Sequence, residues 1–203
     1  MAFKVVFAKG ACPVCSLDLG NDAIAHTNEG ENHPIHRRCM QIWIDAQKLK
    51  APICLSCSVN VTSIETDSEA LVRFSEQGDL EAVKAVKKNG SFFGSYDLAV
   101  YKASENGHHQ VVDELLSSGS ISNECRGMAL EAAAENGHCE VVKRLFSGTM
   151  RYESVPHPSI QKSLIIAREK GYQNIVTSLE QHDRIYALFS DKNSGRSLIE
   201  HCT

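Results

Sequence analysis

One pattern of apolar and polar positions occurs four times after residue 65. It is centred on Gly78, Gly107, Gly137 and Gly171, which lie 29, 30 and 34 residues apart. An aliphatic residue stands seven positions before each glycine, a valine stands five positions after it, and a further aliphatic stands eight positions after it: Leu71, Val100, Leu130 and Leu164; Val83, Val112, Val142 and Val176; Val86, Leu115, Leu145 and Leu179. This spacing predicts a helix, a turn at a left-handed glycine, and a second helix with an apolar stripe. Four such units predict a stacked helical solenoid.

The N-terminal part has a different pattern. Large apolar residues are few between residues 10 and 58, and a segment this short cannot build a sufficient core from them. Met40, Trp43 and Ile44 have helical spacing and predict a helix over Cys39–Lys50, which Pro52 would end. Small domains with such thin cores usually need a disulfide or metal staple.

Cysteines and histidines supply the candidates for that staple. They follow the order C-x2-C, H-x2-H-x2-C and C-x2-C, and comprise Cys12, Cys15, His33, His36, Cys39, Cys54 and Cys57. Two residues between cysteines let a tight turn direct both sulfurs at one tetrahedral ion, so the spacing predicts zinc. Structural zinc converts its binding energy into folding energy.

Charge and composition argue against several classes of protein. The formal charge is −4 with 23% charged residues, so no basic field indicates nucleic-acid binding. No apolar stretch approaches the ~18 residues of a membrane span, and residues 1–9 do not resemble a signal peptide. We therefore expect a cytoplasmic protein with reduced thiols, in which the cysteine pairs bind metal. Disulfides in a secreted chain are the alternative.

The metal-spaced residues resemble a RING finger, the zinc module of many ubiquitin ligases. In that family, ligands alternate between two zinc ions in a cross-brace. The resemblance implies that one ion takes Cys12, Cys15, His36 and Cys39, and that the second takes Glu31, His33, Cys54 and Cys57. Glu31 occupies the place where the family usually has cysteine, and a carboxylate can bind zinc. His26 is chemically better but farther from the expected spacing, and an incomplete second site is a further alternative.

The RING resemblance also implies a partner. RING modules dock a ubiquitin-conjugating enzyme in a shallow apolar groove, and the matching positions here are Val14, Trp43 and Leu55. Trp43 could equally belong to the core. Two positions depart from the family, because Leu55 replaces the usual proline and Ser58 replaces a basic residue that often contacts ubiquitin.

The four repeated units resemble ankyrin repeats, through the phrase A-x-E-N-G-H-x-x-V-V-x-x-L in the second and third. The T-P-L-H sequence that opens an ordinary ankyrin helix is absent. We expect a mainly α protein: a RING-like zinc-binding α+β module over 1–62, four divergent ankyrin-like repeats over 66–181, and a helical cap over 182–203. Ser147–Ser159, with Pro156 and Pro158, should form a loop.

Other reactive residues in the repeats have structural explanations. His108 and His138 follow turn glycines and are expected to hydrogen-bond the turn. Cys125, Cys139 and Cys202 are expected to be idle thiols, because no rigidly held base accompanies them. The candidate partner-binding residues are Tyr96, Tyr101 and Arg126.

These features lead to one main hypothesis and two alternatives. The main hypothesis is a RING-type ubiquitin ligase that recruits a protein substrate through its repeats. The first alternative is a non-enzymatic adaptor in which the zinc module is a rigid interaction element. A thiol or metal hydrolase is the third, and it would require an open metal position such as an unfilled Glu31 site.

Overall fold

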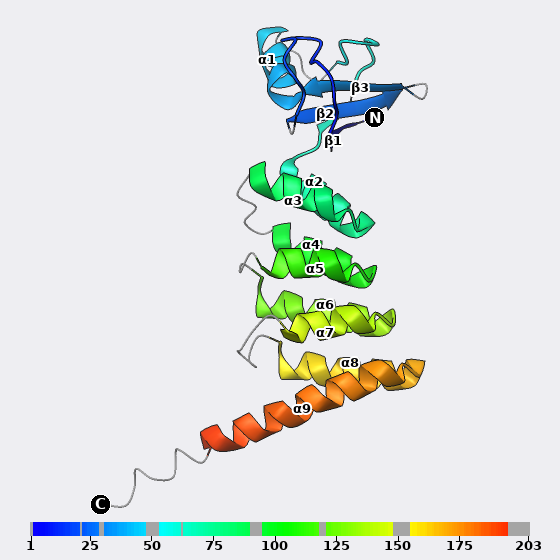
Figure 1. Cartoon of the computed structure of the whole chain (residues 1–203), viewed down its shortest axis with the longest axis vertical. Helices are drawn as coiled ribbons and strands as arrows, with labels where there is room; N and C mark the ends of the chain where they lie inside the picture. Colours follow the sequence, from blue (N-terminus) through cyan, green and yellow to red (C-terminus); the bar gives the residue numbers. More distant parts are fainter. Residues whose placement is uncertain are drawn as a thin grey trace, which may run out of the picture. The chain divides into compact units, whose positions relative to one another are not determined.

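The computed structural model describes residues 2–20, 22–28, 31–47, 53–61, 63–89, 95–117, 121–147 and 155–194. A small N-terminal sheet is followed by paired helices, which confirms the predicted mainly α fold (Figure 1). The chain divides into two compact units. The N-terminal unit comprises Met1–Phe74 and Glu81–Phe92, and the C-terminal unit comprises Ser75–Leu80 and Phe93–Thr203.

The sheet of the N-terminal unit has the strand order β3-β2-β1-β4. Its strands are β1 Ala2–Val6, β2 Ala23–Asn28, β3 Glu31–His36 and β4 Ser63–Ile64. β1 and β2 pair antiparallel, as do β2 and β3, whereas β1 and β4 pair parallel. Helix α1, Arg37–Gln47, follows β3 directly and contains the predicted apolar positions. Phe3, Ile24 and Met40 are fully buried and form the centre of this small core.

The first helix pair belongs mainly to the same unit. Its helices are α2 Asp67–Gln77 and α3 Leu80–Asn89. Glu65, directly after β4, accepts a hydrogen bond from the backbone N–H of Val5 at 2.7 Å. Arg73 of α2 donates to both carboxylate oxygens of Glu65, at 2.7 and 2.8 Å, and to the backbone oxygen of Val5 at 2.9 Å. This bidentate pair fastens α2 to the sheet, because a planar guanidinium matches a carboxylate edge.

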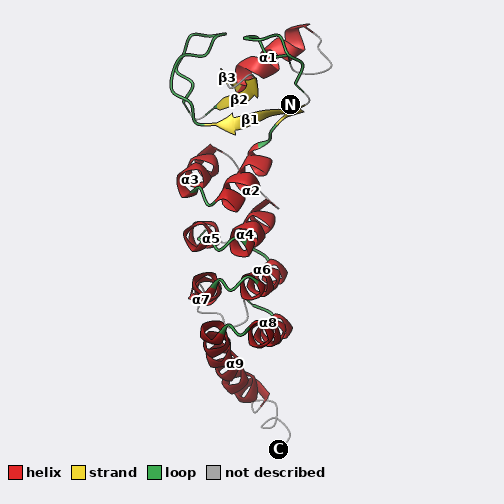
Figure 2. Ribbon diagram, turned by 90° about the vertical axis from the view of Figure 1, so that its right-hand side faces the viewer, coloured by secondary structure: helices red, strands yellow, loops and turns green. Residues whose placement is uncertain are grey.

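The C-terminal unit is a two-layer helical stack. Its helices are α4 Ser95–Glu105, α5 His109–Leu116, α6 Asn123–Glu135, α7 Cys139–Ser147, α8 His157–Lys170 and α9 Gln173–Ser194. α4, α6 and α8 form one layer, and α5, α7 and α9 form the other (Figure 2). The repeated aliphatic positions predicted from the sequence lie between the layers, where Val100, Val112, Leu130 and Leu145 are fully buried. Small side chains such as Ala103 and Ala133 are also fully buried, which lets the helices approach closely.

The turn glycines have the expected left-handed conformation, with φ between 75° and 80° at all four positions. His108 and His138 hydrogen-bond a turn as predicted, but it is the turn of the preceding repeat. The Nε2–H of His108 donates to the backbone oxygen of Glu76, and that of His138 donates to the backbone oxygen of Glu105, both at 3.0 Å. A methyl group added to Gly78 or Gly107 would lie only 2.5 or 2.6 Å from the imidazole of the next repeat.

The C-terminal end differs from the predicted boundaries. α9 runs without a break from Gln173 to Ser194, so no separate helix begins at residue 182. The second helix of the fourth unit therefore continues through the segment expected to be a cap, whose residues 195–203 lie outside those described. In the predicted loop over 147–159, α7 ends at Ser147, α8 begins at His157, and residues 148–154 lie outside those described. Within the described ranges, no helix has the length and apolar character needed to cross a membrane.

Candidate metal centre

Two short hairpins with the same backbone geometry carry the two C-x2-C pairs. In the first, the N–H of Cys12 donates to the oxygen of Leu17 and the N–H of Ser16 donates to the oxygen of Cys12, at 2.8 and 2.9 Å. In the second, Cys54 bonds Val59 in the same way at 3.0 Å, and the N–H of Ser58 donates back to Cys54 at 2.8 Å. Ser16 and Ser58 both adopt left-handed φ, 62° and 59°. This unusual conformation for a non-glycine residue closes each turn and leaves both of its sulfurs on one side.

The first candidate centre joins one hairpin to α1. It comprises Cys12, Cys15, His36 and Cys39, whose ligand atoms all lie within 4.8 Å of one another. The Nδ1 of His36 lies 3.2 Å from the Sγ of Cys15 and 3.8 Å from the Sγ of Cys39. The Nε2–H of His36 donates to the backbone oxygen of Asp18 at 2.8 Å. That outer bond leaves Nδ1 as the free lone pair, which is how metal-binding histidines are commonly oriented.

The second candidate centre joins the other hairpin to the sheet. It comprises His26, His33, Cys54 and Cys57, again with all ligand atoms within 4.8 Å. The Nε2 of His26 lies 3.4 Å from the Sγ of Cys57 and 3.4 Å from the Nδ1 of His33. The Nδ1 of His33 lies 3.6 Å from the Sγ of Cys54.

His26, not Glu31, therefore occupies the place for which the sequence favoured Glu31. Glu31 is exposed, pairs with Asn28 at the end of the β2–β3 hairpin, and does not join the group. His26 pairs directly with His33 across the hairpin, and residues opposite each other on antiparallel strands have close Cβ atoms. The spacing along the sequence gave the wrong ligand because the hairpin brings His26 next to His33, seven positions away.

A signal for His26 is nevertheless present in the sequence. Ile24 and His26 precede the turn at the same intervals at which His33 and Ile35 follow it. Such a mirrored alternation is typical of a hairpin, in which the two isoleucines and the two histidines become cross-strand pairs. The observed register pairs Ile24 with Ile35 and His26 with His33.

The spacing within both groups fits a tetrahedral ion. With Zn–S and Zn–N bonds of about 2.3 and 2.05 Å, such an ion separates sulfur from nitrogen by about 3.6 Å and two nitrogens by about 3.3 Å. The observed sulfur–nitrogen distances range from 3.2 to 3.8 Å, and the nitrogen–nitrogen distance is 3.4 Å. Along the chain the two groups interleave, since the second and fourth ligand pairs form one centre and the first and third form the other.

Burial and hydrogen bonding shift the pKa values of these ligands in both directions. Burial raises the pKa of Cys12, but hydrogen bonds from the backbone N–H groups of His36, Cys15 and Val14 outweigh burial and lower the pKa to about 6. Burial together with the neighbouring Cys15 and Cys12 raises the pKa of Cys39 to about 12. For His26, burial lowers the pKa and favours the neutral imidazole that a metal requires. The lowered pKa of Cys12 favours its thiolate, the form in which a cysteine binds a metal ion.

The predicted docking residues come from both hairpins and from α1. Val14, at the tip of the first hairpin, is 45% exposed, whereas Trp43 is half-buried. Leu55 of the second hairpin is also half-buried and lines a shallow crevice together with Pro13 of the first hairpin and Met40 of α1. The two hairpin tips therefore approach each other beside α1. Leu17 and Ile42, which the sequence analysis did not single out, are 67% and 57% exposed in the same unit.

The candidate residues of the repeats have mixed outcomes. Arg126 is only 6% exposed, so it cannot serve as the surface contact that was predicted. Tyr101 is half-buried and directs its hydroxyl toward Glu105 at 3.5 Å, and Tyr96 is half-buried as well.

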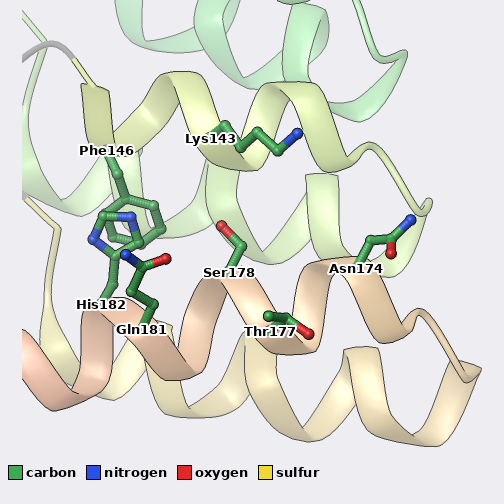
Figure 3. Close-up of a pocket in the computed structure, with 7 residues that line it drawn as sticks. All are labelled: Lys143, Phe146, Asn174, Thr177, Ser178, Gln181 and His182. Carbon is green, nitrogen blue, oxygen red and sulfur yellow. The ribbon is translucent and has the colours of Figure 1, made fainter.

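The C-terminal unit also contains two described thiols and an open groove. Cys125 is buried, its thiol donates to the backbone oxygen of Asp97 at 2.9 Å, and burial raises its pKa to about 12. Cys139 is half-exposed, and Cys202 lies outside the described residues. An open groove of about 420 Å³ between α7 and α9 is bordered by the stacked rings of Phe146 and His182 (Figure 3). Its other lining residues are polar: Lys143, Asn174, Thr177, Ser178 and Gln181.

Comparison with known proteins agrees with the repeat architecture. No curated protein matches the chain. A family model described as ankyrin repeats (3 copies) matches residues 70–156. The match does not reach the cysteine- and histidine-rich residues before it. The chain therefore contains ankyrin repeats, a protein-interaction module, behind an N-terminal segment with two groups of side chains that could each hold a metal ion.

Proposed function

We propose that the protein is a RING-type ubiquitin ligase. Two zinc ions would stabilise the N-terminal module, that module would dock a charged ubiquitin-conjugating enzyme, and the ankyrin repeats would recruit the protein substrate. The observation that carries the proposal is the interleaving of two four-residue groups, Cys12/Cys15/His36/Cys39 and His26/His33/Cys54/Cys57, around one short helix. The RING resemblance implies this cross-brace, and zinc is the ion that tetrahedral sulfur and imidazole ligands favour.

The proposed catalysis needs no general acid or base from this chain. Four protein ligands per ion leave no open coordination position, so the metal would be structural, and this disfavours the hydrolase alternative. The contribution to rate would come from holding the ubiquitin thioester in a reactive orientation beside the attacking amine, a proximity effect. The apolar contact with the conjugating enzyme would be formed by Val14 at the exposed tip of the first hairpin, Leu55 of the second hairpin and the half-buried Trp43 of α1.

The metal part of the proposal is tested by substitution and elemental analysis. The purified chain should contain two zinc ions. His26→Ala should reduce the count to one, whereas Glu31→Ala should leave two, because only His26 lies within the second group. Loss of zinc in Glu31→Ala, with retention in His26→Ala, would contradict the ligand set.

The ligase part is tested by single-turnover discharge of ubiquitin from a panel of charged conjugating enzymes onto free lysine. The zinc-loaded protein should accelerate discharge at least tenfold for one enzyme of the panel. Val14→Arg should remove the acceleration, because a charge would replace the exposed apolar contact. Gln41→Arg, an equal charge change on the exposed side of α1, should leave it intact. Trp43→Ala should also lose acceleration, but its half-buried position makes Val14→Arg the cleaner variant.

Ser58 offers a test in the opposite direction. It occupies the place where RING modules often carry a basic residue that contacts ubiquitin, so Ser58→Arg should raise the discharge rate severalfold. Ser16→Arg is the matched control, since Ser16 has the same left-handed φ at the same position of the other hairpin. An absence of discharge across the panel, with two zinc ions bound and Ser58→Arg also inactive, would favour the adaptor function instead.

A further inference from the structure

Exposed apolar side chains in the C-terminal unit gather on one of its two helical layers. Among its described residues, three large apolar side chains are about half exposed: Leu98, Met128 and Ile165, at 51%, 49% and 57%. One lies on α4, one on α6 and one on α8, the helices that form a single layer (Figure 2). Leu98 and Met128 hold the same repeat position, nine residues before the turn glycine.

The three side chains point away from the helical core. On α4 the buried residues are Ala99, Val100, Ala103 and Ser104, which cover the side of the helix opposite Leu98. The corresponding geometry holds for Met128 on α6 and Ile165 on α8, whose buried residues lie on the other side of each helix. Because α4 packs on α6 and α6 packs on α8, the three lie in a row across adjacent helices, in which Ile165, six residues before Gly171, is offset by about one turn from the other two. We call this row the apolar row.

The charges beside the apolar row leave an excess of carboxylates. Three cations of these helices pair with acids of the same chain: Lys102 with Glu105 at 2.8 Å, Lys162 with Glu131, and Arg168 with Glu180 at 2.8 Å. Glu124 on α6 and Glu169 on α8 are exposed and form no ion pair within the described part of the chain. The row is therefore apolar along its centre and has unpaired carboxylates at its edge. Lys170 is also exposed on α8, but it lies at the end of that helix, beside Gly171.

We infer that the apolar row binds a basic amphipathic helix of a partner protein. Packed helices lie about 8–10 Å apart, so successive side chains of the row are separated by roughly that distance. On an α-helix, residues i and i+7 lie on one face about 10.5 Å apart. A partner helix crossing the three repeats would thus place aliphatic residues i, i+7 and i+14 against Leu98, Met128 and Ile165. Lysine or arginine beside them would face Glu124 and Glu169.

An extended segment fits less well. Its side chains alternate between two faces with a repeat of about 6.6 Å, which does not match the spacing of the helices. A helical partner also bonds its own backbone groups, so a surface without exposed strand edges suffices. The inference rests on the proposed function only in taking the bound protein to be the ligase substrate.

The test is selection from a displayed library of 18-residue helical peptides, using the full-length zinc-loaded chain as bait. The library keeps helix-forming positions fixed and varies the i, i+7 and i+14 positions and their neighbours. Aliphatic residues at the three positions and Lys or Arg beside them should be enriched. An enriched peptide, measured by fluorescence anisotropy, should bind Met128→Asp at least tenfold more weakly than the unaltered chain. Asn174→Asp, an added charge on the exposed side of α9, should bind it normally.

Two further variants address the charge requirement. Glu124→Gln and Glu169→Gln together should weaken the basic peptide about threefold or more and reduce the salt dependence of its binding. Enrichment of acidic peptides, no enrichment, or equal binding to Met128→Asp and Asn174→Asp would each overturn the inference. Ubiquitin discharge onto free lysine does not involve the repeats, so a failed selection with normal discharge would contradict the apolar row alone.

Discussion

The two units reach a folded state by different means. In the C-terminal unit, aliphatic side chains from every helix meet between two layers, and many are completely buried. In the N-terminal sheet, α1 and their connecting loops, the fully buried large side chains are few, chiefly Phe3, Leu19, Ile24 and Met40. The same part of the chain brings together two four-residue groups of cysteine and histidine. Burial of apolar surface scales with size, so we expect the small module to need metal-ligand bonds where the repeats do not.

The first helix pair lies at the boundary between the two kinds of stabilisation. The first helix pair resembles the later repeats in sequence, yet most of it belongs to the N-terminal unit. Phe74 of α2 packs near Phe7, with ring centroids 5.8 Å apart, and Arg73 lies against the Phe74 ring. The stability of the first helix pair should therefore depend on the N-terminal module that carries the two candidate metal groups.

Metal removal should produce the largest difference between the units. Binding of structural zinc contributes about 10–16 kcal/mol in small zinc modules, more than a domain of this size can lose and stay folded. After chelation under reducing conditions, amide hydrogen exchange should become fast across β1–β3 and α1 and accelerate in α2 and α3. Amides of α6 and α7 should keep their protection. Continued protection of β2 and β3 in metal-free protein would remove the basis of the metal proposal.

A cavity in the repeats should have the converse effect. Leu130→Ala removes a fully buried side chain from the centre of α6 and should lower the unfolding free energy of the C-terminal unit by about 2–5 kcal/mol. Thermal unfolding should show this loss while the zinc content stays at two. Leu98→Ala, a change of the same size at a half-exposed position, should cost far less. If Leu130→Ala released zinc, the two units would not be independent.

Breaking the bond between sheet and α2 should have an intermediate effect. Glu65→Gln keeps the shape of the side chain but leaves Arg73 without its carboxylate, at an expected cost of about 2 kcal/mol to the N-terminal unit. Hydrogen exchange in α2 should rise together with exchange in β1. Glu81→Gln, which removes an exposed pair with Lys84, is the control and should change little. Equal effects of the two variants would argue against a structural coupling.

The smallest predicted effect concerns the start of α2. Thr66 and Glu69 form a capping box: the N–H of Thr66 donates to the Glu69 carboxylate at 2.8 Å, and the N–H of Glu69 donates to the Thr66 hydroxyl at 3.2 Å. Thr66→Ala should cost about 1 kcal/mol at pH 7, measured by chemical unfolding of the zinc-loaded protein. The backbone N–H and then the hydroxyl of Thr66 lower the pKa of Glu69. The stabilisation by the ionised Glu69 carboxylate is therefore complete above the ordinary glutamate pKa and is lost as the pH falls through the lowered value. Thr177→Ala in α9 removes a hydroxyl without a cap and should change stability less.

The sequence predicted the repeats well because their period carries the information. Each unit repeats the same aliphatic positions around a glycine, and the left-handed φ of Gly107 and its equivalents follows from that pattern. Seven of the eight clustered side chains were among the predicted ligands, through C-x2-C and H-x2-C spacing, and the cross-brace resemblance divided them into the same two groups. His26 was missed because strand register, not sequence distance, brings it to His33.

Two other misses have physical causes of a similar kind. Arg126 was expected on the surface because arginine usually is, but its position on α6 faces the buried side of the helix. The continuity of α9 past residue 181 was missed because the repeat pattern ends there and supplies no aliphatic register for the remaining turns. Both features depend on neighbouring helices that a single sequence does not display.

The contacts at the turn glycines give the C-terminal stack a direction. Each imidazole or phenol ring stands over the glycine of the unit before it: His108 over Gly78, His138 over Gly107 and Tyr172 over Gly137. Among the described residues, none covers Gly171. A unit therefore supplies an aromatic ring to the turn of the unit before it and a turn glycine to the ring of the unit after it. Exchanging the third and fourth units would put a phenol where an imidazole N–H bonds the Glu105 carbonyl. The units are therefore not interchangeable, and their order along the chain is fixed by these contacts.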